Sequence, residues 1–281
     1  MREVAIIGAG ELGGAAAHLL ARRDLARTVT LIDDSGRVAA GKALDIAQAA
    51  PLEAFSTGLA GTPDLSRASG ASVVIVADRF GARGEWQGEE ALMLLNRLTQ
   101  FARHAVIVCA GAAHRELIDA GVRELKIPRT RLFGTAPEAL AAAARALIAL
   151  AVDGSPQDVA VSILGVPPAH LVIAWEDATI ASSALTRALG DAVRRRLATR
   201  ILALWPPGPY ALASAAVRAI EIMEGRSRRS ATCFAGPDTT AGLRTRAAAL
   251  PVRLGPAGIV EFVVPSLNVV ERVALDSAMS L

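Results

Sequence analysis

The first third of the chain alternates short apolar runs with amphipathic segments. The apolar runs are rich in Val and Ile, which is typical of strands buried in a parallel sheet, and they predict strands at Val4–Ile7, Thr28–Ile32, Ser72–Val76 and Ala105–Cys109. Apolar residues at helical spacing predict helices between them, at Glu11–Arg22, Val38–Ala49 and Glu89–Arg103. This alternation indicates an α/β fold with a doubly wound parallel sheet.

The pattern changes after Gly134. Helices, two of them rich in alanine, are predicted at Pro137–Val152, Ser182–Leu204 and Tyr210–Met223. Strands are predicted at Val159–Leu164, Ser230–Phe234 and Ile259–Pro265. Because these elements no longer alternate regularly, we expect a dinucleotide-binding domain at residues 1–137 and a C-terminal α+β domain at residues 138–281.

Composition excludes several classes of protein. The chain has 281 residues, 52% of them hydrophobic, which is enough for about two domains. A long uncharged run, Ile201–Val217, is interrupted by three prolines and does not predict a membrane-spanning helix. The start of the chain lacks the pattern of a signal peptide. Two cysteines, Cys109 and Cys233, make neither a disulfide framework nor a metal site. We therefore expect a cytoplasmic protein without a metal.

Charge gives no sign of a nucleic-acid partner. The net charge is only +3, and all but two of the 30 basic residues are arginines dispersed among carboxylates. Few aromatic residues are present to stack on bases, since aromatics make up 4% of the chain. Neither nucleic acid nor a membrane is an expected partner.

A glycine-rich turn carries the clearest chemical signal. Gly8, Gly10 and Gly13 form a G-x-G-x-x-G pattern that closes the first strand and opens the first helix. Such a turn lets a pyrophosphate approach backbone amides at the positive end of the helix dipole. Asp33 ends the second strand at the spacing of the carboxylate that binds a ribose 2′-hydroxyl. Asp34 adds a charge that repels a 2′-phosphate, so the pattern predicts a Rossmann domain that binds NAD rather than NADP.

Several further stretches resemble the lactate/malate dehydrogenase family over nearly the whole chain. Leu31–Asp34 followed by Gly41–Ile46 looks like that family's second strand and the next helix, and Arg131–Thr135 is similar to its lead into the catalytic domain. The resemblance implies a Rossmann domain followed by an α+β domain, NAD as cofactor, and a dimer. It also implies hydride transfer to a 2-oxo acid, with a His, an Asp and arginines as catalytic groups.

The positions that correspond to those catalytic groups hold other residues. The family's histidine segment falls on Gly165–Ala169, which places Pro167 at the histidine position. Its helix motif falls on Leu140–Ala143, so that Leu140 replaces the aspartate and Ala143 the substrate arginine. Apolar side chains cannot transfer a proton or hold a carboxylate. The family's usual mechanism is therefore not encoded at these positions.

Three residues remain as weak candidates for a relocated catalytic group. Arg83 is the one arginine of the loop after the fourth strand that matches the family's mobile loop. His114 follows the fifth strand, at the edge where ligands of such sheets bind. His170 lies three residues past Pro167, which along an extended chain is roughly 10 Å. For both histidines a structural role is the more common one.

Two side chains could obstruct the cofactor cleft. Arg79 could pair with the pyrophosphate or block its path, and Glu11 would weaken phosphate binding if it turned inward. Three hypotheses stay open. The chain could be an NAD(H)-binding relative without the standard dehydrogenase machinery, an active NAD-dependent oxidoreductase with a relocated acid/base, or a non-catalytic oligomerisation module. A blocked glycine-rich cleft would favour the last.

Overall fold

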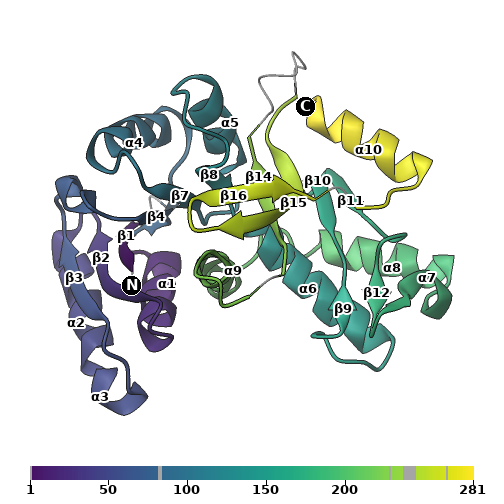
Figure 1. Cartoon of the computed structure of the whole chain (residues 1–281), viewed down its shortest axis with the longest axis horizontal. Helices are drawn as coiled ribbons and strands as arrows, with labels where there is room; N and C mark the ends of the chain where they lie inside the picture. The colour runs from purple at the N-terminus through teal and green to yellow at the C-terminus, as the bar shows by residue number, and fades with distance from the viewer. Residues whose placement is uncertain (1, 82–83, 228, 237–244, 264) are drawn as a thin grey trace.

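A computed structural model describes residues 2–81, 84–227, 229–236, 245–263 and 265–281. One sheet of 11 strands runs through these parts of the chain (Figure 1). Its N-terminal part is parallel and is formed by β3 (Gly58–Thr62), β2 (Ala26–Ile32), β1 (Arg2–Ile7), β4 (Val73–Val76), β7 (Val106–Cys109) and β8 (Leu132–Gly134), in that order. The order reverses direction between β1 and β4, which is where ligands bind in open α/β sheets.

The predicted helices of the first half are present. They are α1 (Glu11–Arg22), α2 (Gly36–Gln48) and α4 (Gly88–Phe101), with the additional short α3 (Ala50–Glu53) and α5 (Arg115–Arg123). The strands and helices alternate as the apolar pattern predicts, which confirms a doubly wound parallel sheet.

The sheet continues into the C-terminal half without a break. Strand β8 pairs in parallel with β7 and antiparallel with β14 (Ala231–Ala235), with Phe234 opposite Gly134. Beyond β14 the antiparallel part contains β15 (Ala248–Gly255), β16 (Gly258–Phe262), β10 (Ile163–Val166) and β11 (His170–Ile173). Parallel pairing therefore ends at β8, close to the predicted domain boundary. The mixed sheet with helices on it agrees with the predicted Rossmann part and α+β part.

Details of the second half differ from the sequence prediction. The single helix predicted at Ser182–Leu204 is wrong, because α7 (Leu185–Ala188) ends before Gly190 and α8 (Asp191–Leu202) starts after it. The strand predicted at Val159–Leu164 is two strands, β9 (Val159–Ala160) and β10, and β9 belongs to a small separate sheet with β12 (Thr179–Ile180) and β13 (Ser183–Ala184). Strand β15 was not predicted. The end of the strand predicted at Ile259–Pro265 includes residue 264, which lies outside the described residues.

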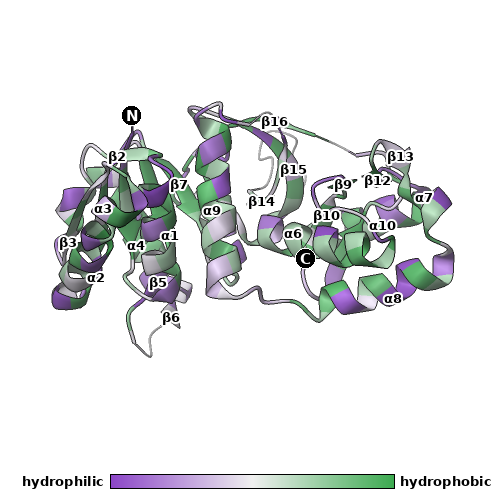
Figure 2. Ribbon diagram, turned by 90° about the horizontal axis from the view of Figure 1, so that it is seen from below, coloured by the Kyte–Doolittle hydropathy of each residue, from purple (hydrophilic) through white to green (hydrophobic). Residues whose placement is uncertain are grey.

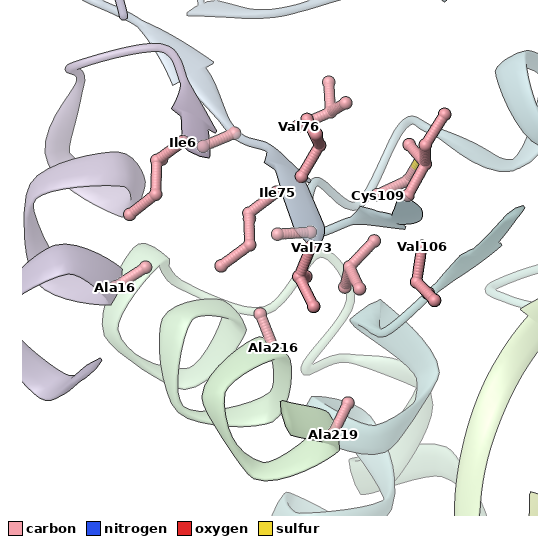
Figure 3. Close-up of a cluster of buried hydrophobic side chains, with 14 of the residues drawn as sticks. Ile6, Ala16, Val73, Ile75, Val76, Val106, Cys109, Ala216 and Ala219 are labelled. Atoms are coloured by element: carbon pink, nitrogen blue, oxygen red, sulfur yellow. The ribbon is translucent and has the colours of Figure 1, made fainter. Parts of the chain in front are cut away.

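A helix of the C-terminal half covers the N-terminal sheet. The predicted helices α6 (Ala136–Ala151) and α9 (Pro209–Met223) are present, and the chain ends in α10 (Val269–Met279). Helix α9 packs beside α1. Figure 3 shows Ala16 of α1 and Ala216 and Ala219 of α9 pointing at the strands that carry Ile6 and Ile75. All five side chains are buried, so the small residues let both helices lie close to the sheet.

Among the described residues, no helix combines the length and the apolar character needed to cross a bilayer.

Candidate functional site

The glycine-rich turn lies between β1 and α1. Gly8 has a φ of +113°, which favours glycine, and a Cβ added to it would lie 2.2 Å from the backbone oxygen of Asp78. A Cβ on Gly13 would lie 2.0 Å from the backbone oxygen of Gly8. The turn is therefore as tight as the glycine pattern predicts.

Asp33 lies at the end of β2, buried against this turn. Its Oδ2 accepts hydrogen bonds from the backbone amides of Ala9 at 2.8 Å and Phe80 at 3.0 Å, and its Oδ1 accepts one from Ser35 at 2.8 Å. Only 5% of the residue is exposed. The carboxylate predicted to bind a ribose is thus beside the turn, and three amides of the chain already bind it.

Asp78 is the residue of this site whose importance the sequence did not show. It begins the short strand β5 (Asp78–Arg79), directly beyond β4 and its neighbour Ala77, and β5 lies beside α1 (Figure 2). Its Oδ2 accepts a hydrogen bond from the amide of Glu11, and its Oδ1 accepts one from the amide of Gly13, both at 2.9 Å. The carboxylate therefore caps the N-terminus of α1, whose own N-cap residue, Gly10, has no side chain to do so.

The carboxylate of Asp78 occupies the place at which a dinucleotide's pyrophosphate would approach the turn. A pyrophosphate would be bound by amides at the start of α1, and the carboxylate of Asp78 lies on two of them. A Cβ built on Gly10 would lie 2.2 Å from Oδ2 of Asp78, so the carboxylate is packed directly on the glycine that a phosphate approaches. The sequence signal for this arrangement is an acidic residue two positions beyond the end of the fourth strand.

The side chains of the two residues suspected of blocking the cleft differ in their surroundings. The Arg79 guanidinium pairs with Glu90 at 2.6 Å and stacks 4.4 Å from the ring centroid of Trp86. Glu11 is exposed and takes part in the site through its backbone amide. Lys42 of α2 donates from Nζ to the backbone oxygen of Gly10 at 2.5 Å. Among these residues, Asp78 is the one whose carboxylate is hydrogen-bonded to the amides at the start of α1.

A second carboxylate binds the loop after β7. Glu85, in β6 (Gly84–Glu85), accepts hydrogen bonds from the amides of Ala112 at 3.0 Å and Ala113 at 2.7 Å. The amides at the carboxyl edge of β7 are thus bound by Glu85, as those of α1 are bound by Asp78.

His114 follows the same loop but lies inside the protein. It is fully buried, its Nδ1 accepts a hydrogen bond from the amide of Gly111 at 3.0 Å, and its Nε2 has no partner among the described residues. Burial lowers the pKa of the imidazole from 6.5 to about 4. The side chain is therefore neutral near pH 7, and its surroundings are those of a core histidine.

The positions that the resemblance assigns to the family's catalytic groups hold apolar residues. Pro167 is buried, Leu140 is buried in α6, and Ala143 is half-buried in the same helix. His170 is exposed on β11 and lies directly opposite Val166 of β10, because residues 167–169 form a turn. The expected separation of roughly 10 Å assumed an extended chain and is wrong for that reason. Arg83 lies outside the described residues.

No group of three or more metal-binding side chains occurs among the described residues. Cys109 at the end of β7 and Cys233 in β14 are both fully buried, free thiols. Burial raises the pKa of each, and the charge of Glu138 adds to the effect at Cys233. Cys109 is therefore a packing residue, as its apolar surroundings in the sequence indicate.

The sequence similarity to known proteins covers almost the whole chain. Residues 2–103 match the family described as lactate/malate dehydrogenase, NAD binding domain. The chain is 25% identical to the malate dehydrogenase of Chlorobium phaeobacteroides, with 99% of this chain and 96% of that protein covered. It is 27% identical to the L-lactate dehydrogenase of Allorhizobium ampelinum, with 97% and 94% covered.

Solved structures agree in fold. The malate dehydrogenase of Salinibacter ruber superimposes with a TM-score of 0.87 at 23% identity, covering 98% of this chain and 93% of that one. The malate dehydrogenase of Aeropyrum pernix superimposes with a TM-score of 0.89 at 19% identity, covering 98% and 95%. The predicted fold and the predicted resemblance are both confirmed, and residues 2–103 are a domain of the NAD-binding type. Residues 2–103 thus match the NAD-binding domain of the lactate/malate dehydrogenase family, and almost the whole chain is similar to malate and lactate dehydrogenases.

Proposed function

We propose that this protein is an NAD(H)-binding relative of the lactate/malate dehydrogenases that has lost the standard 2-hydroxy acid dehydrogenase machinery. One observation carries the proposal: the three positions that the resemblance assigns to the proton donor, the aspartate that orients it and the substrate arginine hold Pro167, Leu140 and Ala143. Reduction of a 2-oxo acid needs a proton for the developing alkoxide and a cation for the carboxylate. None of these three side chains can supply either.

Gly8, Gly10, Gly13 and Asp33 are the proposed cofactor-binding residues. Their place between β1, α1 and β2 supports this assignment, and Asp34 beside Asp33 supports NAD over NADP. We also propose residues 1–137 and 138–281 as the two domains. A homodimer in the cytoplasm is a further part of the proposal, in keeping with the family resemblance and the two free thiols.

One structural observation favours a second candidate, an active oxidoreductase with a relocated acid/base. His170 pairs with Val166 in the antiparallel register, and Val166 directly precedes Pro167 in the chain. Its exposed imidazole is thus closer to the expected site of proton transfer than the sequence suggests. This candidate requires a substrate different from the family's usual ones.

A non-catalytic oligomerisation module is the third candidate. The contact of Asp78 with the amides of Glu11 and Gly13 favours it, because a carboxylate held permanently there would exclude the cofactor. This candidate predicts that NADH does not bind even at millimolar concentration.

The test is a screen for NADH oxidation with the 2-oxo acids that correspond to malate and lactate, and with other small carbonyl compounds. The proposal expects no rate above the uncatalysed background with the wild-type protein, together with NADH binding in a separate titration. Turnover of about 1 s⁻¹ or faster would contradict the proposed loss. If that turnover disappears in His170→Asn but persists in the matched variant His104→Asn, the second candidate is correct.

A further inference from the structure

We infer that Asp78 is an internal competitor for the pyrophosphate position, so that it sets the affinity of this protein for NAD(H). The inference rests on the proposed cofactor binding at the glycine-rich turn. The competing group is one carboxylate, and the donors for which it competes are the amides of Glu11 and Gly13.

The geometry of Asp78 is that of a bound anion. Each carboxylate oxygen accepts one amide hydrogen bond of 2.9 Å at the first turn of α1. Amides at a helix N-terminus are the donors that bind phosphate in dinucleotide sites, and the helix dipole favours a negative charge there. The side chain therefore takes both the space and the hydrogen bonds of a phosphate group.

The backbone of Asp78 is held in place on both sides. Its carbonyl oxygen accepts a hydrogen bond from the amide of Gly10 at 2.9 Å. Two residues later, the amide of Phe80 binds Asp33 at 3.0 Å. The carboxylate thus cannot leave the turn by a shift of the whole segment without breaking these bonds, and rotation of the Asp78 side chain is the simpler route.

A dinucleotide that binds here must displace the carboxylate and then remain close to it. Displacement breaks two charge-assisted hydrogen bonds, and the remaining negative charge repels the phosphates. Two nearby cations make contacts with other groups: Arg79 pairs with Glu90, and Lys42 donates to the backbone oxygen of Gly10. Removing the carboxylate should therefore tighten NADH binding.

The variant Asp78→Ala tests the inference in the full-length protein. NADH is titrated into the wild type, Asp78→Ala and the matched control Asp276→Ala, which removes an exposed carboxylate from α10. Binding is followed by calorimetry and by energy transfer from tryptophan. We expect Asp78→Ala to bind NADH at least about tenfold more tightly than the wild type, which corresponds to about 1.4 kcal/mol, and Asp276→Ala to bind like the wild type.

Thermal unfolding supplies a readout that does not depend on affinity alone. Without ligand, Asp78→Ala should melt below the wild type because α1 has lost its cap, and NADH should raise its Tm more than that of the wild type. If Asp78→Ala does not fold, Asp78→Asn, which keeps an acceptor but loses the charge, should show a smaller gain in the same direction.

Two results would overturn the inference, and they differ for the proposed function. Equal, saturable NADH binding by the wild type and Asp78→Ala would show that Asp78 does not compete, while cofactor binding itself would stand. Absence of binding at millimolar NADH by the wild type and both Asp78 variants would overturn the inference and the proposed function together, leaving the oligomerisation module.

Discussion

The carboxylate of Asp33 and the backbone amide of Phe80 lie 3.0 Å apart, although 47 residues separate them in the chain. The same oxygen also accepts the amide of Ala9 from the glycine-rich turn. One buried side chain thus joins the end of β2, the turn after β1 and the segment that follows β4. In this structure Asp33 stabilises the carboxyl edge of the sheet in addition to its proposed cofactor role.

Replacing Asp33 with Asn should therefore lower the free energy of unfolding by about 2–4 kcal/mol. The amide nitrogen of Asn would face backbone N–H groups on one side, which leaves buried donors without acceptors. Urea unfolding measures the change, and Asp34→Asn is the matched control because Asp34 is exposed; it should change stability by less than about 1 kcal/mol. A loss below 1 kcal/mol in Asp33→Asn would show that the three amides are equally well bound by water.

A loss of stability in Asp33 variants limits what a cofactor titration of those variants can show. A loss of NADH binding in an Asp33 variant could follow from a disturbed turn as well as from a lost ribose contact. Only a variant whose unfolding transition still lies above the titration temperature is informative about the ribose.

Burial of His114 should make the protein less stable below about pH 6.5. The pKa of this imidazole is about 4 in the folded protein and about 6.5 when unfolded, so between these values the unfolded chain binds the proton and the folded one does not. Stability is therefore unaffected above pH 6.5, falls as the pH drops through this window, and has lost about 3 kcal/mol from this group at pH 4.

The variant His114→Asn isolates this contribution, because its side-chain oxygen can accept the hydrogen bond from Gly111 that Nδ1 accepts now. The difference in unfolding free energy between wild type and variant should be constant above pH 7 and should shift in favour of the variant toward pH 4. His104→Asn, at an exposed position, should follow the wild type throughout. A pH-independent difference for His114→Asn would contradict the burial argument.

Both thiols should resist modification in the folded protein. Cys109 and Cys233 are fully buried, and their pKa values are raised, so neither access nor thiolate is available. An aromatic disulfide reagent at pH 8 should label less than about a tenth of the thiols in the time that labels free cysteine completely. In guanidinium chloride both should react. Rapid labelling of one thiol per native chain would show that one of these sites opens.

Much of the fold follows from local patterns. The Val- and Ile-rich runs around Ile6, Ile75 and Val108 are buried on both faces. Such runs are typical of the central strands of a parallel sheet. The glycine-rich turn also follows from its spacing, because the positive φ of Gly8 and the close backbone contacts of Gly8 and Gly13 require glycine at these positions. The C-terminal strands were less predictable: β15 contains Pro251 and Arg253, which interrupt an apolar pattern, and its pairing depends on β14 and β10.

The glycines and the aspartate of the candidate site could be predicted from the sequence, but the contact of the Asp78 carboxylate with the turn could not. Gly8, Gly13 and Asp33 follow from spacing alone. The hydrogen bond from Gly13 to Asp78 joins residues 65 positions apart, and nothing in the sequence around Asp78 specifies which way its side chain turns. The sequence drew attention to the adjacent Arg79 instead, but its guanidinium stacks on Trp86 and pairs with Glu90.

The contact of α9 with the N-terminal sheet should be sensitive to side-chain volume. Ala216 of α9 is fully buried beside the strands, while Ala211 of the same helix is exposed. Ala216→Leu adds three carbons to a packed contact and should destabilise the protein by about 1–3 kcal/mol, whereas Ala211→Leu should stay within about 0.5 kcal/mol of the wild type. Urea unfolding followed by tryptophan fluorescence and by circular dichroism checks both.

Because α9 belongs to the C-terminal half and its contact lies on the N-terminal half, the unfolding transitions seen by the two probes should coincide in Ala216→Leu. Separate transitions would mean that the two halves unfold independently despite their shared sheet.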